Sequence, residues 1–122
     1  MIEFLAGILI LIGASFSLIA GVGLFRLSDL YGRMHAATKA GTLGAGLVLI
    51  ALGLEAQSLE VAARAMALVV FLLFTAPLAA HLLGRAGYLA GVPLWSLSWK
   101  DDLDGKYDPE TKALKATPRE EM

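Results

Sequence analysis

Residues 4–25 read FLAGILILIGASFSLIAGVGLF, an unbroken run of 22 residues without a charged side chain. A second uncharged run of 20 residues, AMALVVFLLFTAPLAAHLLG, covers positions 65–84. Because the hydrocarbon core of a bilayer is about 30 Å thick and a helix rises about 1.5 Å per residue, each run is long enough to cross it. Both are apolar on every side, whereas transmembrane strands alternate apolar and polar residues. The sequence therefore predicts an all-α integral membrane protein.

The composition of the chain points the same way and excludes several function classes. Of 122 residues, 57% are hydrophobic and 17% charged, with a mean hydropathy of +0.70, above the range of soluble domains. The chain starts with Met1, Ile2 and the acidic Glu3, so the first run is expected to remain as a span rather than act as a cleaved signal peptide. Cysteine is absent, and no phosphate-binding loop, metal-ligand cluster or activated nucleophile is visible. We expect no enzyme activity, no cofactor, no structural metal and no nucleic-acid partner.

The middle apolar run is too short to span alone. Positions 40–54 hold 15 uncharged residues, which make only about 22 Å of helix. The helix must therefore begin upstream, where Ser28 or Asp29 can accept hydrogen bonds from its first free N–H groups. We expect three transmembrane helices at about 3–26, 29–54 and 60–85, within a domain of residues 1–90. Lys39 then lies about one turn inside the membrane edge.

Charged residues predict the orientation of these spans. The first loop and the following helix start carry three bases and one acid, and the second loop carries two acids and one base. The first group is Arg26, Asp29, Arg33 and Lys39, and the second is Glu55, Glu60 and Arg64. Arg85 and Lys100 follow the third span before any acid. By the positive-inside rule, the N-terminus lies outside and the C-terminus in the cytoplasm.

Residues 91–122 are expected to form an interfacial segment and a charged cytoplasmic tail. Trp95 and Trp99 are four residues apart beside the membrane exit, where indole rings favour the headgroup level. A specific docking role for the two rings is the alternative. Charges of both signs after residue 100, with Pro109 and Pro118, predict an extended tail that is ordered only where something holds it.

Small residues recur along the first two predicted helices. Gly13, Ser17 and Gly21 are four apart on the first helix, and Gly41 and Gly44 lie among alanines on the second. Rows of small residues let helix backbones approach closely in lipid. They exceed what one mutual contact requires, so we predict assembly with other helices. Ordinary packing within the chain is the alternative.

A polar stripe follows one face of the second predicted helix. Its members are Tyr31, His35, Thr38 and Thr42, with Lys39 beside them and Asp29 at the helix start. Polar and ionisable residues at membrane depth are costly and usually face protein or water, so these are candidate ion-path or coupling residues. The alternative for Lys39 is snorkelling of its long stem to the headgroups, and for His35 a structural hydrogen bond.

The third predicted helix has its own stripe, which runs from Phe74 through Pro77, His81 and Arg85 to Tyr88. Pro77 removes a backbone hydrogen bond, so a kink is expected there. His81 lies about one turn from the exit marked by Arg85. It is a candidate proton relay, although a hydrogen bond to a neighbouring helix is the interpretation we favour.

Two segments resemble a known family. Residues 23–44, GLFRLSDLYGRMHAATKAGTLG, are similar to the signature of the G subunits of Mrp-type Na+/H+ antiporters. Residues 74–81, FTAPLAAH, with RAGY at 85–88, resemble the third span of the same subunits. Ser28 stands where the family usually has proline, which removes a fixed helix entry but supplies a possible cap. The resemblance covers about residues 1–90 and leaves the tail out.

The resemblance implies a small subunit of a hetero-oligomeric complex in the bacterial plasma membrane. Such a complex exchanges Na+ (in some members K+) for protons and contributes to sodium and pH homeostasis. This subunit would be needed for assembly and ion exchange without being an enzyme, while the main proton path is attributed to larger subunits. Its partners would be the other subunits, the lipid bilayer, and Na+ and H+ as transported ions, with Na+ bound only transiently.

Two other classes are compatible with the residues alone. A small self-assembling channel or holin-like pore would use the same small-residue faces to form a homo-oligomer. A structural membrane adaptor would pack against partners without touching an ion. Purification in mild detergent separates the first of these classes: a pure homo-oligomer would support the pore, and co-purification with several larger membrane proteins would exclude it.

Overall fold

The computed structural model describes residues 1–98 and 100–114, and its regular elements are all helices. They are α1 (Ile2–Arg26), α2 (Leu30–His35), the π-helical turn η1 (Ala36–Ala40), α3 (Gly41–Glu55) and α4 (Leu59–Leu89). α2, η1 and α3 continue one another as a single rod of 26 residues. The three resulting rods are long and apolar enough to cross a membrane, which confirms the predicted all-α fold with three spans. The last rod continues one turn beyond its expected end at residue 85.

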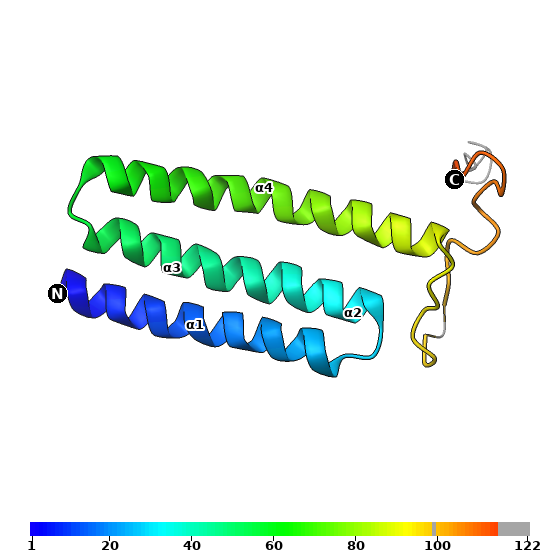
Figure 1. Cartoon of the computed structure of the whole chain (residues 1–122), viewed down its shortest axis with the longest axis horizontal. Helices are drawn as coiled ribbons and strands as arrows, with labels where there is room; N and C mark the ends of the chain where they lie inside the picture. The colour runs from blue at the N-terminus through cyan, green and yellow to red at the C-terminus, as the bar shows by residue number, and fades with distance from the viewer. Residues whose placement is uncertain (99, 115–122) are drawn as a thin grey trace.

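The three rods lie antiparallel in one layer, with the middle rod between the other two (Figure 1). α3 packs against α1 on one side and α4 on the other, and α1 and α4 make no close backbone contact within the described chain. The layer therefore has two broad open faces. The N-terminus lies at one end of the rods, and the segment after α4 lies at the other, which we call the tail end (Figure 1).

Only small residues are buried in this layer. Every buried residue in the described chain is alanine or glycine: Ala6, Gly13, Ala20, Gly44, Ala51, Ala65 and Gly87. On α1 and α3 they recur every seven residues, the repeat of two helices that cross at a small angle. Large apolar side chains point outward, with Phe25 90% and Phe74 77% exposed. Such a surface suits lipid or other membrane helices rather than water.

Short polar contacts fix the helix ends. The Asp29 carboxylate caps α2 by accepting from the Gly32 N–H at 2.7 Å, so it is the cap among the two residues expected. Arg33 donates from Nε to the Leu27 carbonyl at 2.6 Å and holds the α1–α2 turn. At the end of α4, Gly91 adopts a φ of +76°, and the Val92 N–H donates to the Gly87 carbonyl at 3.0 Å. This is the Schellman arrangement, which releases the chain from the helix.

The π-helical turn at Ala36–Ala40 departs from the regular helix expected over residues 29–54. Within it, the Thr38 hydroxyl donates to the Met34 carbonyl at 2.7 Å, where the backbone ladder changes from α to π. A Cβ added at Gly23 of α1 would stand 2.6 Å from the Ala36 Cβ, so α1 and the middle rod are in close contact at this turn. Isolated π turns within α-helices are frequent at functional sites.

Candidate functional site

A groove of about 440 Å³ runs between the middle rod and α4 in the half of the molecule nearest the tail end. It is lined by Tyr31, Met34, His35, Thr38, Lys39, Thr42, Leu73, Ala76, Pro77 and Ala80. We call it the α2–α4 groove. It contains the whole polar stripe of the second predicted helix, and Pro77 of the third stripe lies on its opposite wall. Two patterns about 40 residues apart in sequence thus meet at one place.

The π turn helps to bring Lys39 into this groove. On a regular helix, Lys39 would lie beside the stripe of His35 and Thr42 rather than on it. A π turn rotates less per residue than an α turn, because each hydrogen bond closes over five residues instead of four. The turn therefore swings Lys39 back toward the stripe, and Lys39 lines the groove.

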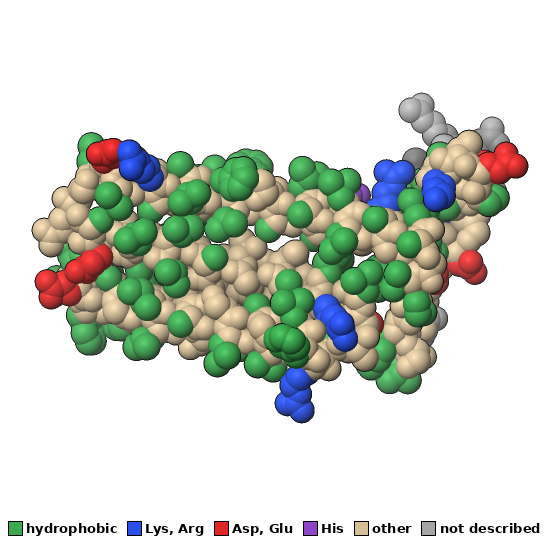
Figure 2. Space-filling model, viewed as in Figure 1, with side chains coloured by type: hydrophobic (Ala, Val, Ile, Leu, Met, Phe, Trp, Pro, Cys, Tyr) green, Lys and Arg blue, Asp and Glu red, His purple; other side chains and the backbone are tan. Residues whose placement is uncertain are grey.

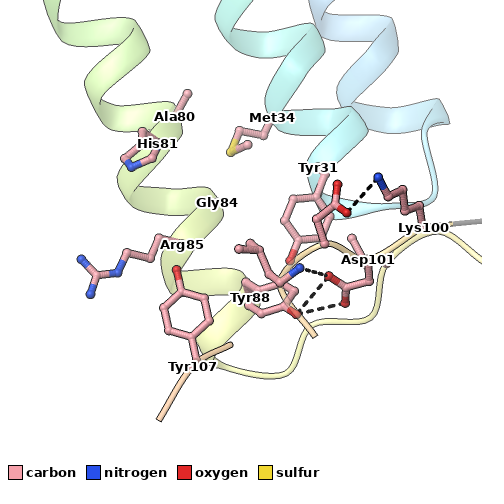
Figure 3. Close-up of a pocket in the computed structure, with 13 residues that line it drawn as sticks. Tyr31, Met34, Ala80, His81, Gly84, Arg85, Tyr88, Lys100, Asp101 and Tyr107 are labelled. Atoms are coloured by element: carbon pink, nitrogen blue, oxygen red, sulfur yellow. Dashed lines mark hydrogen bonds and ion pairs between the residues drawn. The ribbon is translucent and has the colours of Figure 1, made fainter. Parts of the chain in front are cut away.

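A second cavity of about 420 Å³, the tail pocket, continues the groove toward the tail end (Figure 3). The two cavities share Tyr31, Met34 and Ala80. α4 contributes His81, Gly84, Arg85 and Tyr88 to the tail pocket, and the segment after α4 contributes Leu94, Lys100, Asp101, Asp102, Leu103 and Tyr107. His81 thus lies in the same elongated depression as His35 and Lys39, although in its neighbouring compartment.

Two glycines on α4 allow α2 to approach its end. A side chain at Gly87 would stand 2.6 Å from Leu30 Cδ2, and one at Gly84 would stand 3.2 Å from Met34 Cε. The Met34 side chain therefore sits against the bare backbone at Gly84. Sequence reasoning did not assign these two glycines a role. The two glycines are three residues apart and therefore lie on one face of the helix, and this spacing in the sequence could have indicated a close helix contact.

The segment after α4 folds back against the helix ends instead of extending freely. The Tyr88 hydroxyl donates to both carboxylate oxygens of Asp101, at 3.1 and 3.0 Å, and the Leu103 N–H donates to Asp101 Oδ1 at 3.0 Å (Figure 3). The rings of Tyr88 and Tyr107 are 5.7 Å apart, a favourable aromatic contact. Tyr88 thus holds residues 100–114, the condition under which the sequence allowed part of the tail to be ordered. Trp99 and Pro118 lie outside the described residues, and Trp95 is exposed.

The α2–α4 groove carries positive charge and hydrogen-bond donors without a carboxylate of its own. Lys39 and His35 are exposed, and within the described chain Lys39 forms no ion pair. Asp29, the one acid near them on this rod, is engaged as the helix cap. The Tyr31 hydroxyl oxygen is buried with no hydrogen-bond partner in the described part of the protein. Within the described residues, the Lys39 ammonium therefore has no carboxylate partner and the Tyr31 hydroxyl has no hydrogen-bond partner.

The neighbouring acids are already engaged. Asp102 pairs with Lys100 at 3.0 Å, and Asp101 is held by Tyr88. No group of three or more histidine, cysteine or acidic side chains that could hold a metal ion occurs in residues 1–98 and 100–114. A stably coordinated cation would need such oxygen or nitrogen ligands.

The small residues predicted for assembly have different surroundings. Gly13 and Gly44 face each other across the α1–α3 contact, where Ser17 also lies. A Cβ added at Gly41 would stand 3.8 Å from the Ala20 Cβ. These positions are used for packing within the chain. Gly21 has no neighbouring atom within 4 Å, so its face is open.

Comparison with known proteins gives concordant matches. The family model for PhaG_MnhG_YufB, a Na+/H+ antiporter subunit, matches residues 9–88. The chain is similar to the G subunit of the Na(+)/H(+) antiporter of Alkalihalophilus pseudofirmus, with 38% identity over 91% of this chain and 95% of the relative.

Two solved membrane complexes contain a chain with the same fold. One is the Mrp complex from Dietzia sp. DQ12-45-1b, with a TM-score of 0.78 and 26% identity over 83% of this chain and 91% of the other. The other is the membrane-bound sulfane sulfur reductase, an archaeal respiratory membrane complex, with a TM-score of 0.77 and 39% identity over 83% and 94%.

Three apolar rods, each long enough to cross a membrane, define a multi-pass membrane protein. The matches over most of its length show the family: the chain belongs to the PhaG/MnhG/YufB family of Na+/H+ antiporter subunits. The resemblance in residues 23–44 and 74–88 is thereby confirmed.

Proposed function

We propose that this chain is a small membrane subunit of a multisubunit complex that exchanges Na+ for protons. It would act as a subunit of a secondary transporter and not as an enzyme. The family match over residues 9–88 carries the proposal. The structure supports a dependent role, because the layer has two open apolar faces and no enclosed core in its described part. Such a layer needs lipid and neighbouring helices around it.

The α2–α4 groove is the part of the chain that we propose to take part in ion exchange. It gathers Lys39, His35, Thr38 and Thr42 at membrane depth, where ionisable groups are costly unless they serve a purpose. Lys39 would border the cytoplasmic mouth of a cation path completed by other subunits. Its fixed positive charge would modulate the local Na+ affinity and proton release.

Purification of the tagged chain in mild detergent tests the assembly. We expect several larger membrane proteins to co-purify with it. A pure homo-oligomer would support the channel or holin-like alternative instead. The respiratory complex among the structural matches makes a third outcome informative, because co-purification with redox subunits would assign the chain to an assembly of that kind.

We further propose that the N-terminus lies outside and the tail end faces the cytoplasm. On the face shown in Figure 2, most basic side chains lie in the half toward the tail end, and one lies beside acidic side chains at the opposite end. This distribution agrees with the loop charges. Labelling of Ser58→Cys and Ser96→Cys in intact cells tests this orientation. A membrane-impermeant reagent should modify position 58 and leave position 96 protected, and the opposite pattern would reverse the topology.

A further inference from the structure

The α2–α4 groove continues in the direction away from the tail end as a purely apolar trough. This extension, about 210 Å³ in volume, lies between α3 and α4 and shares Thr42 and Leu73 with the groove. Leu43, Gly46, Ile50 and Val69 lie along it. Gly46 has no neighbouring atom within 4 Å, so nothing in the described chain fills the trough at that point. The depression is therefore polar at one end and wholly apolar at the other.

The length of the depression matches one leaflet of a bilayer. From Lys39 to Ile50 is 11 residues, which corresponds to about 16 Å along a helix. Half of the hydrocarbon core is about 15 Å thick. The groove and its extension together thus reach from the headgroup boundary at the tail end to about the middle of the membrane.

The polar end lacks an anion. His35 and Lys39 line it with exposed side chains. The Tyr31 ring lines it too, but its buried hydroxyl points into the tail pocket (Figure 3). Lys39 has no carboxylate partner within the described residues. The acids nearby, Asp101 and Asp102, stand in the tail pocket and are occupied by Tyr88 and Lys100. A phosphate would supply the missing counter-charge.

We propose that the groove and its extension bind an anionic phospholipid from the leaflet at the tail end. The phosphate accepts hydrogen bonds from His35 and Lys39, and one acyl chain lies in the trough between α3 and α4. The bound phosphate would then act together with Lys39 on the electrostatic field of the proposed ion path. A groove at membrane depth cannot stay empty, and its polarity gradient follows that of a phospholipid from headgroup to chain. A wholly apolar transmembrane helix of another subunit would fill the trough but would leave Lys39 without a counter-charge.

Lipid retention tests the proposal independently of ion exchange. The full chain, within the complex that it forms, is placed in bilayer discs of phosphatidylcholine containing a minor share of phosphatidylglycerol, then released into detergent. Retained lipids are counted by native mass spectrometry. We expect retained phosphatidylglycerol to be enriched over its share in the disc. Lys39→Ala should lower its retention about fivefold, because one basic residue near an anionic surface contributes about that factor. Lys39→Arg should keep most of it.

The apolar end has a matched pair of variants. Gly46→Leu fills the trough, whereas Gly7→Leu adds the same side chain on α1 at a position that also has no neighbour within 4 Å. We expect loss of retained phosphatidylglycerol in the first and wild-type retention in the second. No enrichment in the wild type, or equal behaviour of the two variants, would overturn the proposal. A photoreactive residue in place of Leu43 should cross-link to lipid, and a cross-link to another protein would also overturn it.

Discussion

Gly44→Ala should separate the first two rods. The added Cβ would stand 2.7 Å from the Gly13 carbonyl oxygen and 2.8 Å from the Ser17 backbone nitrogen. Ordinary contacts begin at 3.4 Å, so α1 must retreat by about 0.6–0.7 Å, the difference between these distances. The Ser17 hydroxyl can rotate away, but the two backbone atoms move only with the whole helix. The contact repeats every seven residues, so such a shift also loosens Ala6 and Ala51.

The size of the effect follows from two opposing terms. Forcing an extra methyl group into a packed contact costs about 1–3 kcal/mol. Replacing glycine by alanine within a helix returns at most about 1 kcal/mol through backbone propensity. We therefore expect the free energy of unfolding to fall by about 1–2 kcal/mol.

Thermal unfolding of the full chain in detergent, followed by helical circular dichroism, measures this difference. Gly46→Ala is the matched control, since it lies two residues further along the same helix with no atom within 4 Å. The control should unfold at the wild-type temperature or above it, and Gly44→Ala clearly below. Equal midpoints for the two variants would refute the account of the α1–α3 contact.

Three further changes have defined outcomes. His81→Gln should keep antiport in the assembled complex if the imidazole only donates a hydrogen bond, because an amide also donates, and full loss of antiport would assign it to proton transfer. Tyr88→Phe should increase trypsin cleavage between residues 100 and 114 because it frees Asp101, and unchanged cleavage would mean that this hydrogen bond does not hold the segment. Gly21→Leu should reduce incorporation into the complex more than Gly7→Leu. Both glycines are open within the chain, so equal effects would mean that the Gly21 face is not the one used for assembly.

The spans and the first cap could be predicted because they depend on local quantities. Run length and polarity decide whether a segment crosses a bilayer. The shortage of apolar residues at positions 40–54 required an upstream start, and Asp29 is where α2 is capped. The same shortage predicts that Lys39 lies at membrane depth, and this stays a prediction.

The groove could be predicted only in part. Helical periodicity puts Tyr31, His35, Thr38 and Thr42 on one face whatever lies opposite. Which helix faces that stripe depends on packing, and the participation of Pro77 and Ala80 came from the structure. The π turn was not foreseen, because AATKA differs little from any other helical segment. At its first residue, Ala36, the turn lies close to Gly23 of α1.

The fold of the tail depends on contacts that sequence patterns do not encode. Asp101 and Tyr107 lie in a polar segment whose composition predicts an extended chain. Both contact Tyr88 on α4. The stripe of residues from Phe74 to Tyr88 predicted which helix face Tyr88 lies on, but it did not predict what Tyr88 contacts. The small-residue rows were visible in sequence, but only the structure separates Gly13, which packs within the chain, from the open Gly21.

An antiport assay in vesicles measures whether this chain and its Lys39 take part in ion exchange. Everted membrane vesicles from cells that lack this chain, complemented with wild type, Lys39→Ala or Lys39→Arg, are energised and then given Na+ while the transmembrane pH gradient is followed. We expect no Na+-dependent proton movement without the chain, and full recovery with wild type. Lys39→Ala should alter the apparent Na+ affinity or the pH profile, and Lys39→Arg should have a milder effect. Equal antiport with and without the chain would contradict its role in the complex. Wild-type kinetics in an assembled Lys39→Ala complex would show that Lys39 takes no part in ion exchange.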